Sequence, residues 1–172
     1  MLVPVVVALV VLVRVLGGNG TSDGRVAQVS GTPSPQREDL PPLPVDVPPV
    51  TPAADASCPA LMSALPLDLT GEQSRPVQSA SPFAYAWGDP PIVLVCGVDR
   101  PAGFDATASI IQIENVQWFV DTSNPDVVVW TAVDRPVYVQ VTLPSSVDSA
   151  PVTLLSPVVA GALPAQEPQP GP

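Results

Sequence analysis

The sequence contains no histidine and no lysine, and only two of its 172 residues are cysteines. Histidine is the commonest general base and the commonest transition-metal ligand in proteins, so its absence removes both from the chain's chemistry. The sequence also has no Gly-x-Ser-x-Gly motif, no glycine-rich phosphate loop and no spaced run of aspartates for calcium. We therefore expect no catalytic residues, no bound cofactor and no metal site.

Positive charge is scarce as well. Six arginines stand against 16 acidic residues, which gives a net charge of −10. Because neutralising nucleic-acid phosphates needs clustered basic residues, this balance excludes nucleic acid as a partner. It also disfavours adhesion of the folded domain to an anionic membrane surface. The acidic residues fall in segments rich in turn formers, so a carboxylate-based hydrolase acting on wall sugars or peptides is only a distant alternative.

The two cysteines, Cys58 and Cys96, allow one intramolecular pairing. Two thiolates without histidine make an incomplete zinc site, so outside the cytosol a disulfide is expected. In a reducing compartment the same residues would be two buried free thiols. A disulfide here would stabilise the fold by about 4 kcal/mol in the chain-entropy model.

The N-terminus carries an uninterrupted apolar run from Leu2 to Val13, which ends at Arg14. Counted through Leu16 it would span about 22 Å as a helix, short of the roughly 30 Å hydrocarbon core of a bilayer. We expect residues 1–16 to be a signal peptide or a membrane anchor, truncated at its start, with a retained anchor favoured because no clear cleavage site follows. The alternative is a core element of a cytosolic protein.

The remaining chain predicts one domain with flexible ends. Residues 17–39 are rich in Gly, Ser, Thr and Pro and should form a disordered linker, and residues 165–172 a disordered tail. Residues 40–164 form the expected extracytoplasmic domain. Within it, Leu40 to Pro52 should be polyproline-II or an edge strand packed on the domain, with a proline-rich docking ligand as the alternative.

Periodicity within the domain favours an α+β fold of five or six mostly antiparallel strands between two short helices. The N-terminal helix is expected at Ala53–Leu65 with Asp55 or Ser57 as its N-cap, and Thr70–Ala80 should be turn-like. Strands are expected at Phe83–Trp87, Ile92–Val98, Ala108–Glu114, Val116–Asp121, Val127–Val133 and Pro136–Leu143. The C-terminal helix is expected at Ala150–Leu163.

A short motif occurs twice at predicted strand ends: Cys96-Gly-Val-Asp-Arg-Pro101 is echoed by Thr131-Ala-Val-Asp-Arg-Pro136. If the two copies are neighbours in the sheet, Asp99 can pair with Arg135 and Asp134 with Arg100. The alternative is an anion site in which Arg100 and Arg135 converge on a carboxylate or phosphate.

Aromatic residues are the other candidates for a binding surface. Phe83, Tyr85 and Trp87 alternate along one strand, which suits a core better than a platform for sugar rings or lipid. The candidate residues, which would either bind a ligand or stabilise a corner of the fold, are therefore Arg100, Arg135, Asp99, Asp134, Trp87 and Trp118.

The joint spacing of several motifs resembles one protein family. These motifs are Cys58-Pro59, Trp87-Gly-Asp-Pro90, Cys96-Gly-Val98 with Arg100-Pro101, Gln117-Trp-Phe119, Asp134-Arg-Pro-Val-Tyr138, and Leu155-Ser-Pro157 with Leu163-Pro164. They look like an actinobacterial family of membrane-anchored proteins, the domain of unknown function thirty-five fifteen, over about residues 40–164. The resemblance implies an N-terminal anchor and a domain facing the cell envelope, and it implies no activity.

Together these observations favour a non-enzymatic, membrane-anchored extracytoplasmic domain that binds an envelope protein or a cell-wall component. The domain would be secreted if the N-terminal segment were cleaved. A receptor for a small ligand or anion, built from the aromatic stripe and the two Asp-Arg-Pro corners, is the alternative.

Overall fold

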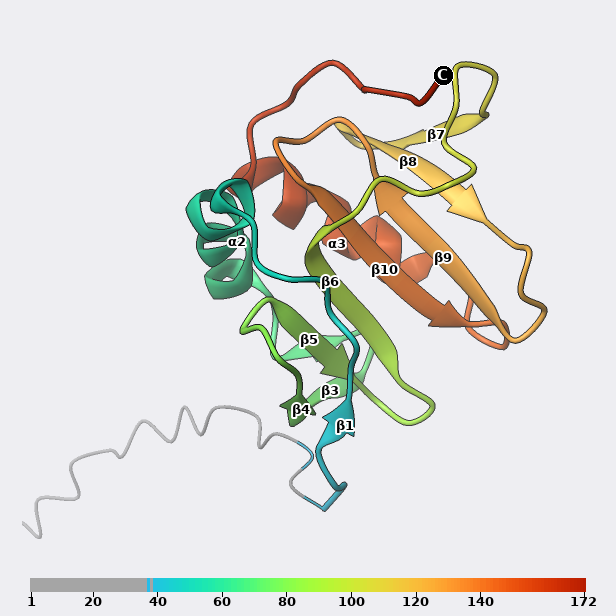
Figure 1. Ribbon diagram of the computed structural model, residues 1–172. Coiled ribbons are helices and arrows are strands. Elements are labelled where there is room, and N and C mark those ends of the chain that lie inside the picture. The colour runs from blue at the N-terminus through green and yellow to red at the C-terminus, as the bar shows by residue number, and fades with distance from the viewer. Residues whose placement is uncertain (1–36, 38) are drawn as a thin grey trace, which may run out of the picture. The chain divides into compact units, whose positions relative to one another are not determined.

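The computed structural model describes residues 37 and 39–172 (Figure 1). The predicted anchor at 1–16 and most of the predicted linker at 17–39 lie outside these residues. Within the described part of the chain, neither helix has the length and apolar character needed to cross a membrane.

An eight-stranded antiparallel sheet organises the domain, with the strand order β2-β3-β5-β6-β10-β9-β8-β7. Its strands are β2 (Asp68–Leu69), β3 (Glu72–Arg75), β5 (Ala84–Trp87), β6 (Ile92–Val98), β7 (Ile110–Ile113), β8 (Val116–Asp121), β9 (Val127–Ala132) and β10 (Tyr138–Pro144). A second, parallel sheet has only the short strands β1 (Leu43–Pro44) and β4 (Val77–Gln78). The α+β class is confirmed.

The expected strand number of five or six was wrong. The six predicted strands correspond to β5 through β10, and the sheet continues through β3 and β2 on the β5 side. These extra strands lie within or just before the segment Thr70–Ala80, which we interpreted as turns. Because β2 and β3 have two and four residues, and β3 reads Glu-Gln-Ser-Arg, they lack the apolar alternation that marks a strand in a sequence.

Two helices, α2 (Pro52–Ala64) and α3 (Ala150–Ala162), complete the part of the chain that the structure describes. The predicted N-caps of the first helix, Asp55 and Ser57, were wrong: Thr51 caps it, accepting a hydrogen bond from the backbone N–H of Ala54 at 3.1 Å. Pro52 then occupies the first helical position, where a missing N–H costs nothing.

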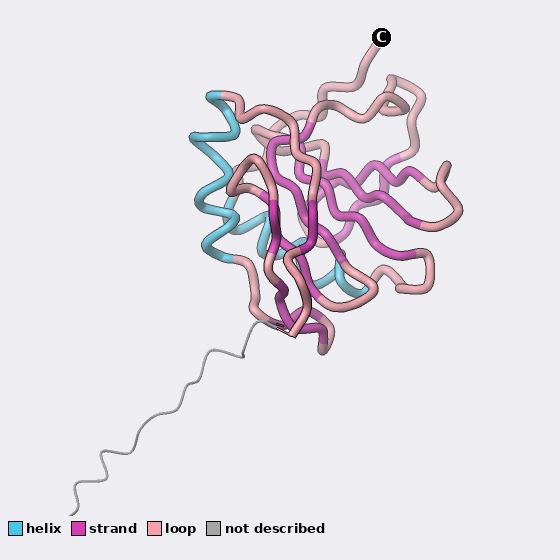
Figure 2. Tube along the Cα trace, turned by 60° about the horizontal axis from the view of Figure 1, so that its bottom comes forward, coloured by secondary structure: helices cyan, strands magenta, loops and turns pink. Residues whose placement is uncertain are grey.

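Both helices cover the same face of the sheet, and the core lies between (Figures 1 and 2). Strand β10 shows how the sequence encodes this: Val139, Val141 and Leu143 are buried, while the residues between them are only half-buried. This alternation is the period of two expected of a strand with one face on the core.

The opposite face of the sheet, called the outer face below, is covered only in part. The cyan segment that contains β1 crosses in front of β6 before it enters α2 (Figure 1). Leu43, Val45 and Val47 are half-buried, whereas Pro44 and Asp46, which lie between them, are exposed. The prediction of an extended segment packed on the domain is therefore confirmed.

Candidate functional site

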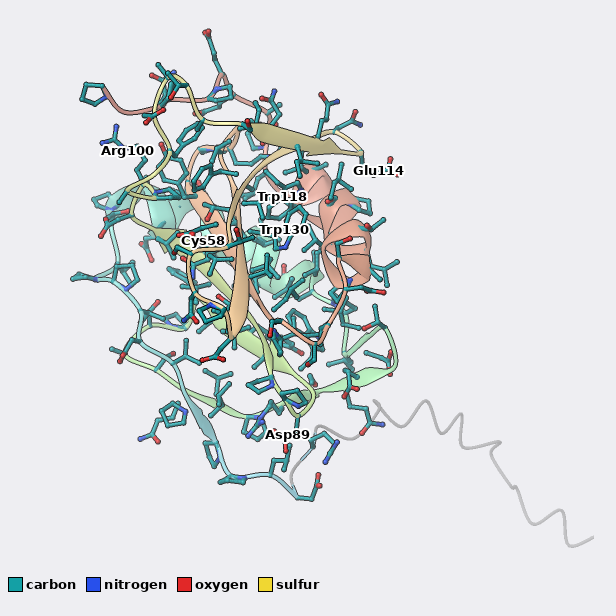
Figure 3. The ribbon with its side chains drawn as sticks, turned by 90° about the vertical axis from the view of Figure 1, so that its right-hand side faces the viewer. Cys58, Asp89, Arg100, Glu114, Trp118 and Trp130 are labelled. Carbon is teal, nitrogen blue, oxygen red and sulfur yellow. A yellow bond between two sulfur atoms is a disulfide. The ribbon has the colours of Figure 1, made fainter. Side chains whose placement is uncertain are left out.

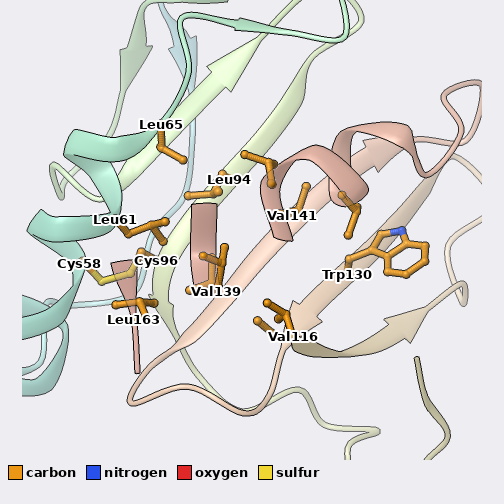
Figure 4. Close-up of a cluster of buried hydrophobic side chains, with 14 of the residues drawn as sticks. Cys58, Leu61, Leu65, Leu94, Cys96, Val116, Trp130, Val139, Val141 and Leu163 are labelled. Atoms are coloured by element: carbon orange, nitrogen blue, oxygen red, sulfur yellow. A yellow bond between two sulfur atoms is a disulfide. The ribbon is translucent and has the colours of Figure 1, made fainter. Parts of the chain in front are cut away.

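The disulfide Cys58–Cys96 joins the middle of α2 to β6, as Figure 4 shows. Both cysteines are buried, so the bond lies inside the core. Gly97 lies beside it with a positive φ of 87°, and a Cβ at this position would come within 2.6 Å of the Cβ of Ala54. Gly97 also has no partner in β10, because Val98 is opposite Tyr138 and Cys96 is opposite Val139. This glycine bulge lets α2 approach the strand closely enough for the disulfide.

The second Asp-Arg-Pro copy forms a buried corner. Asp134 and Arg135 form an ion pair at 3.2 Å, and both side chains are at least 95 % buried. Arg135 also donates to the carbonyls of Asp134 and Asn115, and Asn115 lies in the turn between β7 and β8. The corner therefore holds the β7–β8 hairpin against the connection between β9 and β10.

The first copy is arranged differently. Its two motif residues, Asp99 and Arg100, are exposed and begin the long loop that leads to β7. The copies do flank the same end of the paired strands β6 and β10. The expected cross-pairs, Asp99 with Arg135 and Asp134 with Arg100, are nevertheless absent from the ion pairs of the described residues. The chain bends at 134–137, which brings neighbouring side chains together and lets Asp134 pair with Arg135 instead.

The two candidate tryptophans belong to the core. Trp87 and Trp118 are completely buried, and their indole N–H groups donate to the Pro66 carbonyl at 2.8 Å and to Ser156 Oγ at 3.0 Å. Figure 3 shows Trp118 and Trp130 in the interior, with Arg100 nearer one end of the molecule and Asp89 at the other. Within the part of the chain that the structure describes, Trp87 and Arg135 are buried in separate structural roles and Arg100 is exposed, so these three side chains do not line one pocket.

Arg75, the other buried arginine that precedes a proline, is also structural. Its guanidinium donates to the carbonyls of Gly88 and Pro41 at 3.2 Å each, and Asp89 lies 3.6 Å away. Because Pro41 precedes β1, these contacts fasten the start of the domain to the turn between β5 and β6.

Two shallow hollows lie near this end of the sheet. One, of about 470 Å³, is bordered by Arg75–Val77, by Ser79–Pro82 and by Ala84 and Tyr85, beside the short strand β4. The other, of about 260 Å³, lies between Leu43–Asp46 and the outer face of β6 and β10. Their linings are mostly small, apolar and hydroxyl residues, which offer no acid–base pair.

Two carboxylates, Asp105 and Asp121, act as turn formers. Hydrogen bonds from Thr107, through its hydroxyl and its backbone N–H, hold the pKa of Asp105 below its ordinary value. The backbone N–H of Ser123 does the same for the pKa of Asp121. A general acid of a glycosidase needs a raised pKa, so these carboxyls do not suit that role. Among residues 37 and 39–172, no three metal-binding side chains cluster.

Strand β7 is the surface feature that sequence reasoning did not single out. It is the last strand of the sheet on its side, and its residues Ile110 and Ile111 are 42 % and 48 % exposed. Natural sheets protect such edges with lysine, proline or charge, and the stretch Ala108–Ile113 has none of these. The lack of charged residues in this stretch was the sequence signal that could have revealed an exposed edge. The edge offers unpaired backbone groups to a partner strand.

Comparison with known proteins adds one relationship. A family model described as a protein of unknown function, DUF3515, matches residues 3–168. Neither the curated proteins nor the solved structures contain a significant match.

Proposed function

This chain belongs to the DUF3515 family of proteins of unknown function, and we propose that it is a non-enzymatic interaction domain on the extracytoplasmic side of the cell membrane. The N-terminal apolar segment would anchor it, or direct its secretion if cleaved. Its partner would be an envelope protein or a cell-wall component of an actinobacterial cell.

The observation that carries the proposed location is the disulfide Cys58–Cys96. Structural disulfides persist in oxidising compartments and are rare in the cytosol. The apolar run Leu2–Val13 supports the same location because it precedes a domain that contains a disulfide.

The exposed edge β7 supports a binding role over the alternatives. A partner chain that adds a strand here gains main-chain hydrogen bonds, and the side chains of Ile110 and Ile111 provide apolar contact. The small-ligand alternative has less support, since Trp87 and Arg135 are buried in separate places in the described part of the chain.

The location is tested on cells that carry the full chain with a C-terminal tag. We expect protease added outside intact spheroplasts to degrade the tagged domain, and thiol alkylation under denaturing conditions to leave Cys58 and Cys96 unlabelled until a reductant is added. Protection from the protease together with two free thiols would overturn the proposed location.

The binding role is tested by a photo-crosslinking amino acid at Ser109, an exposed position beside β7. We expect a discrete adduct in cells that disappears with Ile111→Lys, since a lysine on the edge opposes strand addition. Leu154→Lys is the matched control, because Leu154 is similarly exposed but lies on α3. Equal adducts in both variants would contradict binding at this edge.

A further inference from the structure

The C-terminal tail, residues 165–172, lies against the domain, although the sequence predicted a disordered segment. Figure 1 shows it leaving the end of α3 and crossing to the loop that precedes β7. The backbone N–H of Gln166 donates to the Asp134 carbonyl at 2.8 Å, and that of Gly171 donates to the Phe104 carbonyl at 2.8 Å. Between these points, the Tyr138 hydroxyl donates to the Gln169 carbonyl at 3.1 Å.

All three of these hydrogen bonds use main-chain atoms of the tail. Gly171 also forms a parallel bridge with Asp105, so the tail ends as a one-residue strand addition. Recognition of this kind depends on hydrogen bonds to an extended backbone rather than on a particular set of side chains. The surface beneath the tail, which we call the tail-docking surface, consists of Arg100, Phe104, Asp105, Asp134 and Tyr138.

The tail itself is lightly held. Gly171 is its one buried residue, Pro168 is half-buried, and the other six tail residues are exposed. A segment that buries so little apolar surface opens at low free-energy cost compared with the core. The chain can therefore leave this surface without unfolding the domain.

The site of Gly171 has a specific shape. A Cβ there would lie 2.7 Å from a terminal nitrogen of Arg100, so the exposed guanidinium lies directly over the glycine. Arg100 makes no ion pair within the described residues. A side chain at this position would meet only the mobile end of the exposed Arg100, which can shift aside, so the site tolerates residues other than glycine.

We propose that the tail-docking surface is a binding site for an extended, proline-rich segment of another polypeptide, and that the tail occupies it in cis as a displaceable substitute. The partner segment would follow the path of Gln166 to Gly171 and would place its backbone beneath the Arg100 guanidinium. This inference deepens the interaction role proposed above and rests on it. Its test uses purified protein, so its failure would leave the proposed location untouched.

The test removes the backbone donors of the tail and leaves the surface unchanged. In the full chain, Gln166→Pro with Gly171→Pro deletes both N–H groups, because proline has none. The probe is a fluorescent peptide with the sequence of residues 164–172, Pro-Ala-Gln-Glu-Pro-Gln-Pro-Gly-Pro. We expect saturable binding to the variant at least about tenfold tighter than to the wild type, whose own tail competes at a millimolar effective concentration.

The control peptide carries the same two proline replacements and should not bind. A variant with native near-ultraviolet circular dichroism and an intact disulfide that fails to bind the probe would overturn the proposal. Tail exchange between two copies, seen as concentration-dependent dimerisation of the wild type in sedimentation, would also overturn it, because the occupant would then be a second copy.

Amide hydrogen exchange of the wild type provides a second measurement that needs no variant. We expect the amides of Gln166 and Gly171 to exchange at least a hundredfold faster than those of the central strands β6 and β10. Equal protection of the tail and these strands would show that the tail is not displaceable.

Discussion

Trp118 on β8 and Ser156 on α3 are joined across the core by a hydrogen bond of 3.0 Å from the indole N–H to the hydroxyl oxygen. The Ser156 hydroxyl in turn donates to the Val152 carbonyl at 2.8 Å. The Ser156 hydroxyl thus accepts a hydrogen bond from the buried indole N–H and donates its own hydrogen bond within the helix. This chain of two bonds connects the sheet to the helix on its apolar face.

The first prediction compares two buried tryptophans. Trp118→Phe should lower the free energy of unfolding by roughly 1 kcal/mol more than Trp130→Phe, since a hydrogen bond to a neutral group contributes about that much. Trp130 is the matched control because its buried indole nitrogen has no hydrogen-bond partner among residues 37 and 39–172. Urea unfolding followed by circular dichroism measures both, and a loss for Trp118→Phe no larger than the control's would contradict the role of Ser156.

Much of the sheet could be predicted from its sequence pattern. Strands β5 through β10 were identified because their apolar residues alternate or run continuously, as in Tyr138–Pro144 and Ile92–Val98. The pairing of Cys58 with Cys96 was the expected one, because only two cysteines are present. Strands β2 and β3 were missed since they owe their conformation to neighbouring strands rather than to their own composition.

The candidate site was less predictable. The two Asp-Arg-Pro copies do lie at the same end of the paired strands β6 and β10. Their side-chain pairing depends on a local bend that makes Asp134 and Arg135 partners, and no periodicity reveals such a bend. The path of the tail depends in the same way on single contacts, such as that between Gly171 and Phe104.

The second prediction concerns two glycines. Gly97→Ala should lower the free energy of unfolding by about 2 kcal/mol or more, because Gly97 has a positive φ and the new methyl would lie 2.6 Å from the Cβ of Ala54. Gly161→Ala is the control: it belongs to α3, and no described residue outside its own stretch of helix lies within 4 Å of its Cβ position, so we expect stabilisation of about 0.5–1 kcal/mol. Thermal or urea unfolding distinguishes the two, and similar effects at both positions would refute the close helix approach.

The third prediction is a pH dependence. Hydrogen bonds lower the pKa values of Asp105 and Asp121 from the ordinary value of 3.8. A group whose folded pKa is lowered stabilises the protein above its unfolded pKa, and this stabilisation is lost as the pH falls through the folded pKa. The urea midpoint should therefore decrease below about pH 4.

The matched variant for this prediction is Asp105→Asn with Asp121→Asn, which keeps an acceptor oxygen at each turn but removes the titration. We expect its urea midpoint to fall less steeply between about pH 4 and pH 2 than that of the wild type. An unchanged slope would mean that these two turns do not contribute to acid sensitivity.

The last prediction tests the buried corner that holds the β7–β8 hairpin. Arg135→Met leaves Asp134 buried without its cation and the Asn115 carbonyl without its donor, so we expect a loss of about 3–5 kcal/mol in the free energy of unfolding. Arg37→Met is the control, because its ion pair with Asp39 is exposed and should contribute nothing measurable.

Adding Asp134→Leu to Arg135→Met should recover part of the loss, since the uncompensated charge is then removed. Amides of β7 should exchange faster in Arg135→Met than in Arg37→Met, because the turn is no longer held. If Arg135→Met costs no more than Arg37→Met, the corner does not position the exposed edge, and binding at β7 would have to be explained by the strand alone.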